Sequence, residues 1–413
     1  MVIKLLASYF AWCARRVVAR ANKDKVIIGV TGSSGKTSTK EALGAIAKAK
    51  YSEKALVASG NLNNEIGLPL SVLGYTQTPS SWCYPQVIAG ALWRAFTYKP
   101  PSIYVLEYGI DHPGDMDFLL SVAKPTVAVL TNISSVHLEY FNDTKQLVKE
   151  KLKLAHAVNK DTVIINGDDS RLRQACDDLK ISVTTFGEKA HCNWRVAEMK
   201  VDKASTSFTV VNLQKKYHFS INALGMQHVL SVLPAIIFGH SVGMDEKDIQ
   251  NALNNYRPLP GRGNIIAGRK KSIIINETYN ANPLSTRMAL EVLAIMKGRP
   301  KIAILGDMLE LGAESEKEHQ AVLSYAYQVA DEVITVGPRM KIANNKGNAF
   351  TDLEKAKEYV VHNLKESAII LVKGSQGVRM EKIVEAIMLD SSNKEKLLPR
   401  QNKRWQKIPI KPI

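Results

Sequence analysis

Apolar and polar positions along this chain alternate in a way that predicts an α/β fold. Short runs of β-branched and aliphatic residues are each followed by a polar loop and then by a segment with helical spacing. Parallel strands need crossover connections, so such alternation favours doubly wound, mostly parallel sheets. The strands are expected at residues 26–30, 103–108, 126–130, 162–165, 272–275, 301–305, 332–336 and 368–372.

The regular alternation changes once, between residues 194 and 221. Apolar side chains recur there at every second position, which predicts antiparallel hairpins at one edge of the first sheet. A helix is expected at 225–239, and the proline- and glycine-rich segment 257–264 is typical of a linker. We therefore expect an N-terminal helix (1–24), a central domain (25–261), a second α/β domain (262–389) and a basic, loosely held tail (390–413).

The N-terminal helix carries an apolar stripe, with arginines from residue 15 onward. The stripe consists of Leu5, Leu6, Tyr9, Phe10, Cys13 and Val17. It is about half as long as the ~20 residues that a membrane span needs, and no cleavage-like end follows it. Two interpretations stay open: a helix lying in a membrane interface, or a helix docked on the next domain with its arginines in solvent. The aromatic-rich segment 79–101 allows core packing or a second membrane contact.

Composition adds a strong positive charge to this picture. The 413 residues, 45% of them hydrophobic and 23% charged, describe an ordinary globular protein of two or three domains. The net charge of +16 is partly concentrated at the two ends of the chain, which favours attraction to an anionic surface. The four cysteines have no metal-binding spacing, so a reducing cytoplasm is the expected location, with peripheral contact at the inner face of the membrane as an open alternative.

Residues 26–42 predict a phosphate-binding loop. A buried strand leads into a turn of small residues and then into an amphipathic helix, so that backbone N–H groups and the helix dipole face an anion. Lys36 can reach the β- and γ-phosphates, and the Thr37 hydroxyl can hold Mg²⁺. Val30 stands where the general motif has glycine, so the loop has a shorter form. Its expected binding residues are Gly32, Ser33, Ser34, Gly35, Lys36, Thr37 and Ser38.

Two further polar side chains follow strands at the same edge of the expected sheet. Glu107 and His137 each come after a buried run, and ligands of doubly wound sheets lie at the carboxyl ends of the strands. Both could complete a Mg²⁺ shell beside bound ATP, although Mg²⁺ prefers oxygen. Glu107 could equally be a helix cap or an ion-pair partner, and His137 could be structural.

Nine segments in order resemble the motifs of the Mur ligases, ATP-dependent amide-forming enzymes of peptidoglycan assembly. They are TGSSGKTSTKE, GNLNNEIGLPL, VLEYGIDHPGD, LTNISSVHLEYF, INGDD, PLPGR, ETYNANP, LGDMLELG and VKGS, within residues 26–388. The second, seventh and eighth are most similar to the type that adds D-alanyl-D-alanine to UDP-N-acetylmuramoyl-tripeptide. The resemblance implies a P-loop central domain, a Rossmann-like C-terminal domain and a ligase that forms ADP and phosphate through an acyl phosphate.

The resemblance also implies roles for single residues. Lys36 and Thr37 would bind ATP phosphates and Mg²⁺, and Arg262 would reach the γ-phosphate when the domains close. Glu107, His137 and a carbamylated Lys151 would hold two Mg²⁺ ions, and the catalytic group would be Lys36, His137, Lys151 and Arg262. Asn166, Asp169 and Glu277 would contact the nucleotide. The expected substrate loops carry Asn63, Asn64, Glu65, Tyr279, Asn280, Asn282, Asp307, Glu310, Lys373 and Ser375.

The chain also departs from the family pattern. Only the basic helix precedes the phosphate loop, where the family has an N-terminal domain that holds the UDP-sugar. The family's G-x-H-N-x-x-N motif reads GMQHVLS at 225–231, its paired aspartates are Asn276 and Glu277, and its K-G-S-R arginine is Gln376. A monomer acting on small molecules, with no nucleic acid partner, is expected. A Mur-like ligase for another carboxylate and amine, or a non-ligating nucleotide-binding scaffold, remain alternatives.

Overall fold

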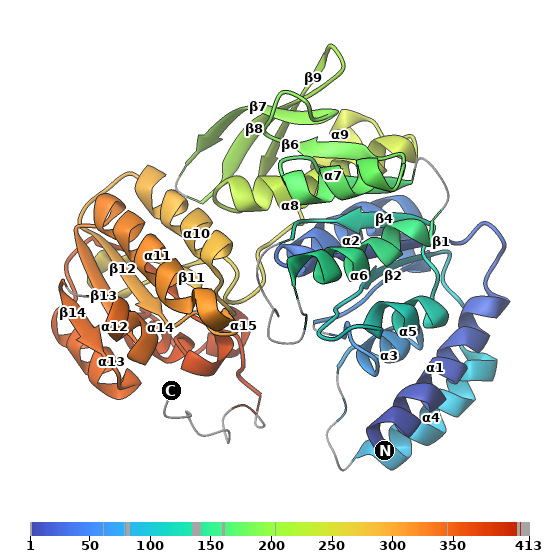
Figure 1. Ribbon diagram of the computed structural model, residues 1–413, viewed down its shortest axis with the longest axis horizontal. Coiled ribbons are helices and arrows are strands. Elements are labelled where there is room, and N and C mark those ends of the chain that lie inside the picture. The colour runs from blue at the N-terminus through green and yellow to red at the C-terminus, as the bar shows by residue number, and fades with distance from the viewer. Residues whose placement is uncertain are drawn as a thin grey trace. The chain divides into compact units, whose positions relative to one another are not determined.

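The computed structural model describes residues 2–60, 62–77, 79, 83–133, 141, 143–158, 162–202, 204–344, 346–402 and 405. The chain forms two compact units (Figure 1). Unit 1 comprises Met1–Glu198, Phe208–Ser220 and Leu230–Tyr256, and unit 2 comprises Met199–Ser207, Ile221–Val229 and Arg257–Ile413. Among the described residues, no helix combines the length and the apolar character needed to cross a membrane.

A nine-stranded sheet, most of which belongs to unit 1, places the phosphate loop. Its order is β2-β3-β1-β4-β5-β6-β7-β8-β9. The central strand β1 (Val26–Thr31) pairs in parallel with β3 (Ile103–Glu107) and with β4 (Val127–Leu130). The other strands are β2 (Ala55–Val57), β5 (Val163–Asn166), β6 (Thr184–Gly187), β7 (Trp194–Val201), β8 (Thr206–Asn212) and β9 (Lys215–Ile221). Neighbours β8 and β9 are joined by two residues, so the expected antiparallel hairpin is confirmed at this end of the sheet.

Three helices around this sheet begin at aspartate capping residues. The N–H groups in the first turn of a helix have no hydrogen-bond acceptor within the helix itself. In α6, α7 and α9 the side chains of Asp143, Asp169 and Asp245 supply that acceptor. The helices are α2 (Lys36–Tyr51), α3 (Gly67–Val72), α4 (Tyr84–Thr97), α5 (Asp115–Val122), α6 (Thr144–His156), α7 (Ser170–Asp178), α8 (Met226–Ser241) and α9 (Glu246–Leu253). A 3₁₀ turn, η1 (Ser52–Lys54), follows α2.

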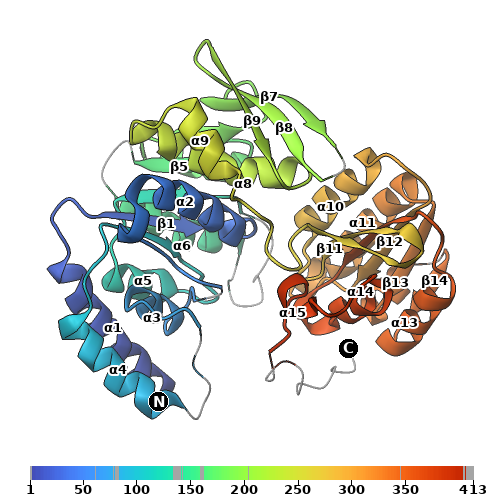
Figure 2. The ribbon, with the colours of Figure 1, turned by 180° about the vertical axis from the view of Figure 1, so that it is seen from behind.

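The N-terminal helix α1 (Val2–Arg20) is docked on unit 1. Its side chains Phe10, Cys13 and Val17 are completely buried in the main apolar core. It runs beside α4, and the Tyr9 hydroxyl donates to the carbonyl of Ile88 on that helix (Figures 1 and 2). The docked arrangement is therefore confirmed, while the opposite face of α1 stays exposed.

Unit 2 contains a six-stranded sheet of order β10-β11-β15-β12-β13-β14. All the pairings are parallel except that of β10 with β11. The strands are β10 (Asn264–Ala267), β11 (Ile273–Glu277), β12 (Lys301–Gly306), β13 (Glu332–Val336), β14 (Asn348–Phe350) and β15 (Ile369–Lys373). The helices are α10 (Pro283–Ile295), α11 (Ser315–Val329), α12 (Pro338–Ala343), α13 (Leu353–His362), α14 (Glu381–Ile387) and α15 (Lys394–Leu397), with 3₁₀ turns at η3 (Arg269–Lys271), η4 (Gly312–Glu314) and η5 (Gln376–Val378).

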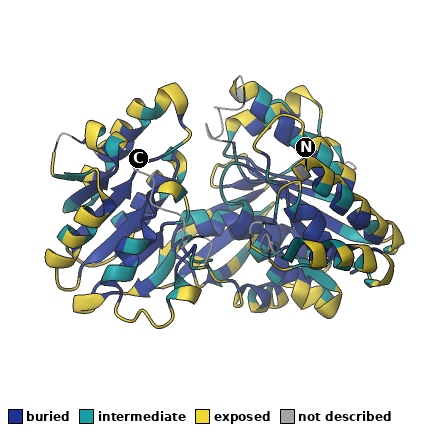
Figure 3. Ribbon diagram, turned by 90° about the horizontal axis from the view of Figure 1, so that it is seen from below, coloured by how far each residue is buried: buried dark blue, intermediate teal, exposed yellow. Residues whose placement is uncertain are grey.

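The strands of both sheets are largely buried, whereas the outer faces of the helices are exposed (Figure 3). Strands such as β3, β12 and β15 are buried at every position, which explains why their sequences are continuous apolar runs rather than alternating ones. The predicted strands are thus confirmed with shifts of one or two residues. Polar side chains then appear where each strand leaves the core, as at Glu107 and Lys373.

The expectation of a loosely held tail is wrong for residues 398–400. Leu398 and Arg400 are buried against unit 2. The Arg400 guanidinium lies 2.6 Å from the carboxylate of Glu381, which is only 1% exposed, and donates to the Tyr279 carbonyl at 2.8 Å. Glu381 is also paired with Arg379 at 2.6 Å, so two cations surround this buried carboxylate, and its charge helps to hold this part of the tail in place.

Candidate active site

The phosphate loop follows β1 directly and depends on two glycines. Gly35 has φ +78° and precedes the first residue of α2, while Gly32 has φ +145°. A Cβ atom on Gly32 would lie 2.0 Å from the Oγ1 atom of Thr131. Only glycine therefore allows the loop to approach the end of β4 this closely.

The residues after β4 hold the phosphate loop in shape. The N–H of Ser33 donates to the Asn132 carbonyl at 2.8 Å, and the N–H of Ser34 donates to the Asn132 side-chain oxygen at 2.9 Å. The Thr131 hydroxyl donates to the Ser34 carbonyl at 2.6 Å. Thr131 and Asn132 were not among the predicted site residues; their place directly after a strand that neighbours β1 was the available signal.

Two lysine amines converge on the carbonyl of Gly32. Lys36 Nζ lies 2.8 Å and Lys151 Nζ lies 3.1 Å from this oxygen. Lys151 on α6 is only 2% exposed, so it is not an ordinary surface lysine. Burial, followed by the charge of Lys36, lowers the pKa of Lys151 well below its usual value, although Asp111 and Glu150 oppose the shift. Burial therefore shifts the balance toward the neutral amine.

Glu107 offers a carboxylate oxygen suited to a cation. Its side chain is 3% exposed, and its Oε1 atom accepts a hydrogen bond of 2.9 Å from the Asn63 side chain. Its Oε2 atom is buried and has no hydrogen-bond partner among the residues that the structure describes. A lone buried carboxylate oxygen is unfavourable unless a cation is near. The buried Thr37 hydroxyl, at the start of α2, adds the kind of oxygen that Mg²⁺ takes.

The residues of unit 1 therefore fit Mg²⁺ by their chemistry. Glu107 pairs in register with Val30, just before the phosphate loop, as expected for side chains at the carboxyl ends of parallel strands. The predicted ligand His137 lies outside the described residues.

Other predicted residues of unit 1 make hydrogen bonds within their own loops. Asn64 accepts from the N–H of Gly67, the first residue of α3, at 2.9 Å, while Glu65 is exposed. Asn166 accepts from Asp168 N at 2.9 Å. Asp169 caps α7 and also accepts from the N–H of Ile133 at 2.6 Å, which joins the loops after β5 and β4. These interactions give the loops a fixed shape.

The acidic residue expected at the ribose, Glu277, lies in a buried polar cluster of unit 2. Its Oε2 atom is 3.2 Å from Lys373 Nζ, and its Oε1 atom accepts from the Gln227 side chain at 2.6 Å. Lys373 also donates to the Asn280 carbonyl at 3.0 Å. Sequence analysis recorded Gln227 only as a departure from a family motif, so its contact with Glu277 is new.

His228 is buried beside this cluster. Burial lowers its pKa, while the charge of Glu277 acts in the opposite direction. A Cβ atom on Gly263, which has φ +86°, would lie 2.5 Å from the Nε2 atom of His228. The glycine in the predicted linker therefore makes room for the imidazole.

Ser375 joins two of the predicted substrate loops. Its hydroxyl accepts from the N–H of Leu309 at 2.9 Å and donates to the Ala281 carbonyl at 3.2 Å. Asp307 is completely buried and accepts from the N–H of Met340 at 2.7 Å, at the start of α12. Burial raises the pKa of the Asp307 carboxyl, and the backbone N–H groups that it accepts from oppose this shift. Asp307 therefore shapes the loop that Ser375 holds.

The loop 279–282 is fixed at both ends. Asn282 caps α10 through a reciprocal pair of hydrogen bonds with Ser285, whereas Asn280 is exposed. The Arg262 guanidinium carbon lies 3.9 Å from the centroid of the Tyr279 ring, a cation–π contact. Arg400, which sequence reasoning placed in a loose tail, donates to the Tyr279 carbonyl. Glu310, in the neighbouring loop, is exposed and has φ +65°.

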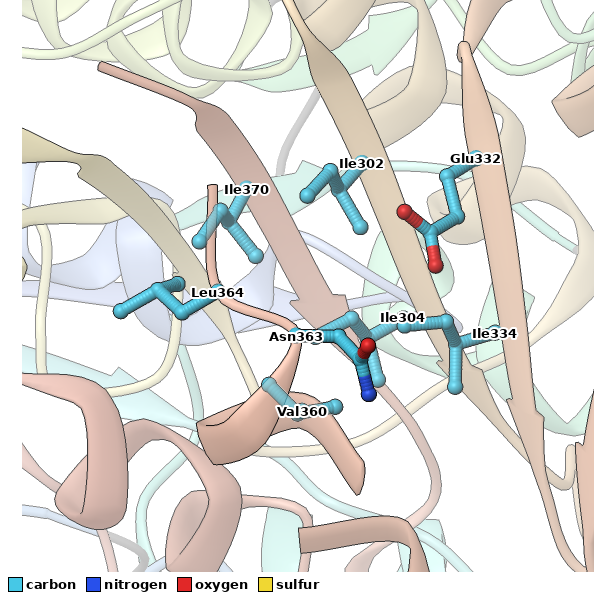
Figure 4. Close-up of a pocket in the computed structure, with 8 residues that line it drawn as sticks. All are labelled: Ile302, Ile304, Glu332, Ile334, Val360, Asn363, Leu364 and Ile370. Atoms are coloured by element: carbon cyan, nitrogen blue, oxygen red, sulfur yellow. The ribbon is translucent and has the colours of Figure 1, made fainter. Parts of the chain in front are cut away.

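A separate pocket of unit 2 lies between the sheet and α13 (Figure 4). Four of its eight lining residues are isoleucines, including Ile302 and Ile370. The only charged residue in the lining, Glu332, is paired with Lys365 at 2.8 Å. The pocket holds none of the predicted site residues.

Comparison with known families identifies this arrangement. Residues 30–239 match the profile of the Mur ligase middle domain, and residues 261–376 match that of the Mur ligase, glutamate ligase domain. The chain belongs to the Mur ligase family. The phosphate loop, Glu107 and Lys151 all lie in the matched middle domain, and Glu277 and Lys373 in the matched second domain.

Individual relatives are similar over most of their length. The UDP-N-acetylmuramoyl-tripeptide–D-alanyl-D-alanine ligase of Bacillus subtilis is 28% identical over 374 residues, covering 88% of this chain and 76% of that protein. The corresponding Escherichia coli ligase is 29% identical over 392 residues, covering 91% and 78%. The crystal structure of the MurF ligase from Thermotoga maritima in complex with ADP has a TM-score of 0.78 and 26% identity, covering 92% of this chain and 83% of that one.

Proposed function

We propose that this protein is an ATP-dependent ligase that joins D-alanyl-D-alanine to UDP-N-acetylmuramoyl-tripeptide in peptidoglycan precursor synthesis. The relatives with this name match most of the chain. The observation that carries the chemistry is the convergence of Lys36 and the buried Lys151 on the phosphate loop, beside a buried carboxylate, Glu107. A non-ligating scaffold would not need a desolvated amine at this place.

The reaction has two steps. The tripeptide carboxylate attacks the γ-phosphorus of ATP, and ADP leaves as an acyl phosphate forms. The amine of D-alanyl-D-alanine then attacks the acyl carbon, loses a proton and displaces phosphate. Lys36 and the loop N–H groups orient the ATP phosphates, and Arg262 adds a second positive charge that reaches the γ-phosphate when the domains close.

Mg²⁺ is part of this proposal. We propose two Mg²⁺ ions, with Thr37, Glu107 and His137 among their ligands. The ions would supply positive charge that offsets the negative charge of the transferring phosphoryl group. Asn63 orients Glu107 by donating to its Oε1 atom, which leaves Oε2 available for a cation. Asn166, Asp169 and Glu277 are proposed contacts of the nucleotide.

Lys151 is proposed to be carbamylated. A neutral amine can attack CO₂: the nitrogen–carbon bond forms, a proton is lost to solvent, and an anionic oxygen ligand results. The lowered pKa of Lys151 raises the fraction of the amine in the neutral, reactive form. The neighbouring ammonium of Lys36 would then pair with the carbamate, which turns a repulsive pair of charges into an attractive one.

The acceptor and amine are proposed to contact the polar loops described above. In unit 1 these include Asn63, Asn64 and Glu65, and in unit 2 they carry Tyr279, Asn280, Asn282, Asp307, Glu310, Lys373 and Ser375. We also propose that the protein acts as a monomer, with domain limits at 25–261 and 262–389. Peripheral membrane contact is argued separately below.

The test measures phosphate release from ATP with UDP-N-acetylmuramoyl-tripeptide and D-alanyl-D-alanine, singly and together, and determines the product mass. Release that requires both substrates, with the pentapeptide mass appearing, is expected. A Lys36→Met variant should abolish release, whereas Lys149→Met, an exposed position on α6, should retain it. Turnover only with another carboxylate or amine would overturn the substrate assignment, and tight ATP binding without turnover would favour a scaffold.

A further inference from the structure

The outward faces of α1 and α4 carry large apolar side chains that the core does not use. Trp93 is 71% exposed and Phe96 is 53% exposed, and Leu5, Trp12 and Leu92 are exposed as well. Together with Arg16 we name these residues the α1–α4 face. Soluble proteins rarely expose such a group of large apolar side chains without a binding function.

Three side chains of this face, Trp12, Arg16 and Phe96, are in contact across the two helices. The Arg16 guanidinium lies 4.4 Å from the centroid of the Phe96 ring and 5.3 Å from that of Trp12. The two rings are themselves 6.4 Å apart in an edge-to-face arrangement. The aromatic groups are therefore held together by a cation rather than scattered over the helices.

The α1–α4 face is also positively charged. Neither helix contains an acidic residue, whereas they contain Lys4, Arg15, Arg16, Arg20 and Arg94. Three of these cations have partners in the fold. Arg20 donates to the carbonyl oxygens of Phe96, in the last turn of α4, and of Tyr98, just after it, and Arg94 donates to that of Leu73. Arg15 lies 3.5 Å from the Ser121 hydroxyl on α5. Lys4, Arg15 and Arg16 are exposed, so the charge of the face comes mainly from α1.

The face is preformed rather than folded on contact. The inner sides of both helices, with Phe10 and Val17 of α1 and Ala91 and Ala95 of α4, are completely buried. The position of α1 along α4 is fixed near both ends by the Tyr9 hydroxyl and by Arg20. A partner would therefore meet a rigid surface of exposed tryptophan, phenylalanine and arginine.

We propose that the α1–α4 face docks the protein on an anionic lipid surface. Trp93, Phe96 and Leu92 would lie at the headgroup level, where amphipathic aromatic rings are favoured. Arg16 and Lys4 would meet lipid phosphates. The absence of acidic groups from both helices favours this anionic partner over a protein surface of mixed charge. The inference does not depend on the ligase reaction.

Vesicle co-sedimentation tests this proposal with the full chain. The protein is mixed with vesicles of phosphatidylcholine alone or of phosphatidylcholine with phosphatidylglycerol. Wild type should bind the anionic vesicles, less tightly as salt rises. Trp93→Ser with Phe96→Ser should weaken binding at least about tenfold, because the inserted apolar area is lost. Arg16→Gln should weaken it about fivefold, since one basic residue near an anionic surface contributes roughly that factor.

Matched controls remove the same chemistry elsewhere. Leu213→Ser with Ile342→Ser changes two other exposed apolar side chains, and Lys216→Gln removes another exposed cation. These variants should bind anionic vesicles as wild type does, and circular dichroism should be the same for all. Absence of vesicle binding by folded wild type, equal loss in the controls, or equal binding to neutral vesicles would overturn the proposal. So would a dimer in sedimentation velocity that the double variant at Trp93 and Phe96 abolishes, because the face would then bind a second copy.

Discussion

Replacing Lys151 with methionine should stabilise the fold while it destroys activity. Methionine has a similar length and no charge, so it can occupy the buried space on α6. The hydrogen bond that is lost goes to the Gly32 carbonyl, which still accepts from Lys36. Wild type, by contrast, buries an amine whose protonated form is disfavoured by burial and by the charge of Lys36.

The size of the effect should depend on pH in a defined way. The pKa of Lys151 is lowered in the folded protein, whereas in the unfolded chain it is about 10.4. Above the unfolded value both states are neutral, and the amine has no pH-linked cost. Below it the unfolded chain takes up a proton that the folded protein does not, so wild type loses about 1.4 kcal/mol of stability for each pH unit until the folded pKa is reached. The advantage of the methionine variant should therefore grow as pH falls.

Urea unfolding in CO₂-free buffer, at several values between about pH 7 and about pH 9, measures this difference. Lys149→Met is the matched control, because Lys149 is exposed on the same helix and should show no pH-dependent difference. Added bicarbonate should stabilise wild type and leave the methionine variant unchanged if the carbamate forms. A methionine variant that is less stable than wild type, or a difference that does not vary with pH, would refute the reasoning.

Three further changes test other parts of the structure. Gly32→Ala should lower ATP turnover at least about 100-fold with the fold retained, because the new Cβ atom would overlap Thr131; turnover close to wild type would contradict the loop geometry. Burial lowers the pKa of His319 below the unfolded value of about 6.5, so the free energy of unfolding should fall as pH falls through that value. In urea melts His319→Gln should lose less of this free energy than wild type between about pH 7.5 and about pH 5.5. Equal losses would show that His319 does not contribute. Arg400→Met removes one of the two cations paired with the buried Glu381 carboxylate and should destabilise unit 2 by about 1 to 3 kcal/mol, since Arg379 still pairs with it. A neutral effect in thermal unfolding would mean that the tail does not hold the fold.

The sequence alone determined the elements and the position of the phosphate loop. Buried strands such as β3 and β15 are continuous apolar runs, and the polar residue that ends each run marks the carboxyl edge of a sheet. Strand, small-residue turn and helix succeed one another within residues 26–42, so the loop could be recognised from local order. Glu107 was predicted for the same reason, because it directly follows its strand.

Only the tertiary structure decided the burial and the contacts of the side chains around that loop. Lys151 lies 119 residues from Gly32 in the sequence, and nothing in its own helix shows that its amine is buried. Contacts between distant segments also account for the hydrogen bonds from Thr131 and Asn132 to the phosphate loop, and for the burial of Arg400 beside Glu381. Local patterns report which face of an element is apolar, whereas burial and charge pairing depend on what that face meets. The pKa of Lys151, and with it the chemistry proposed for the site, therefore follows from the fold.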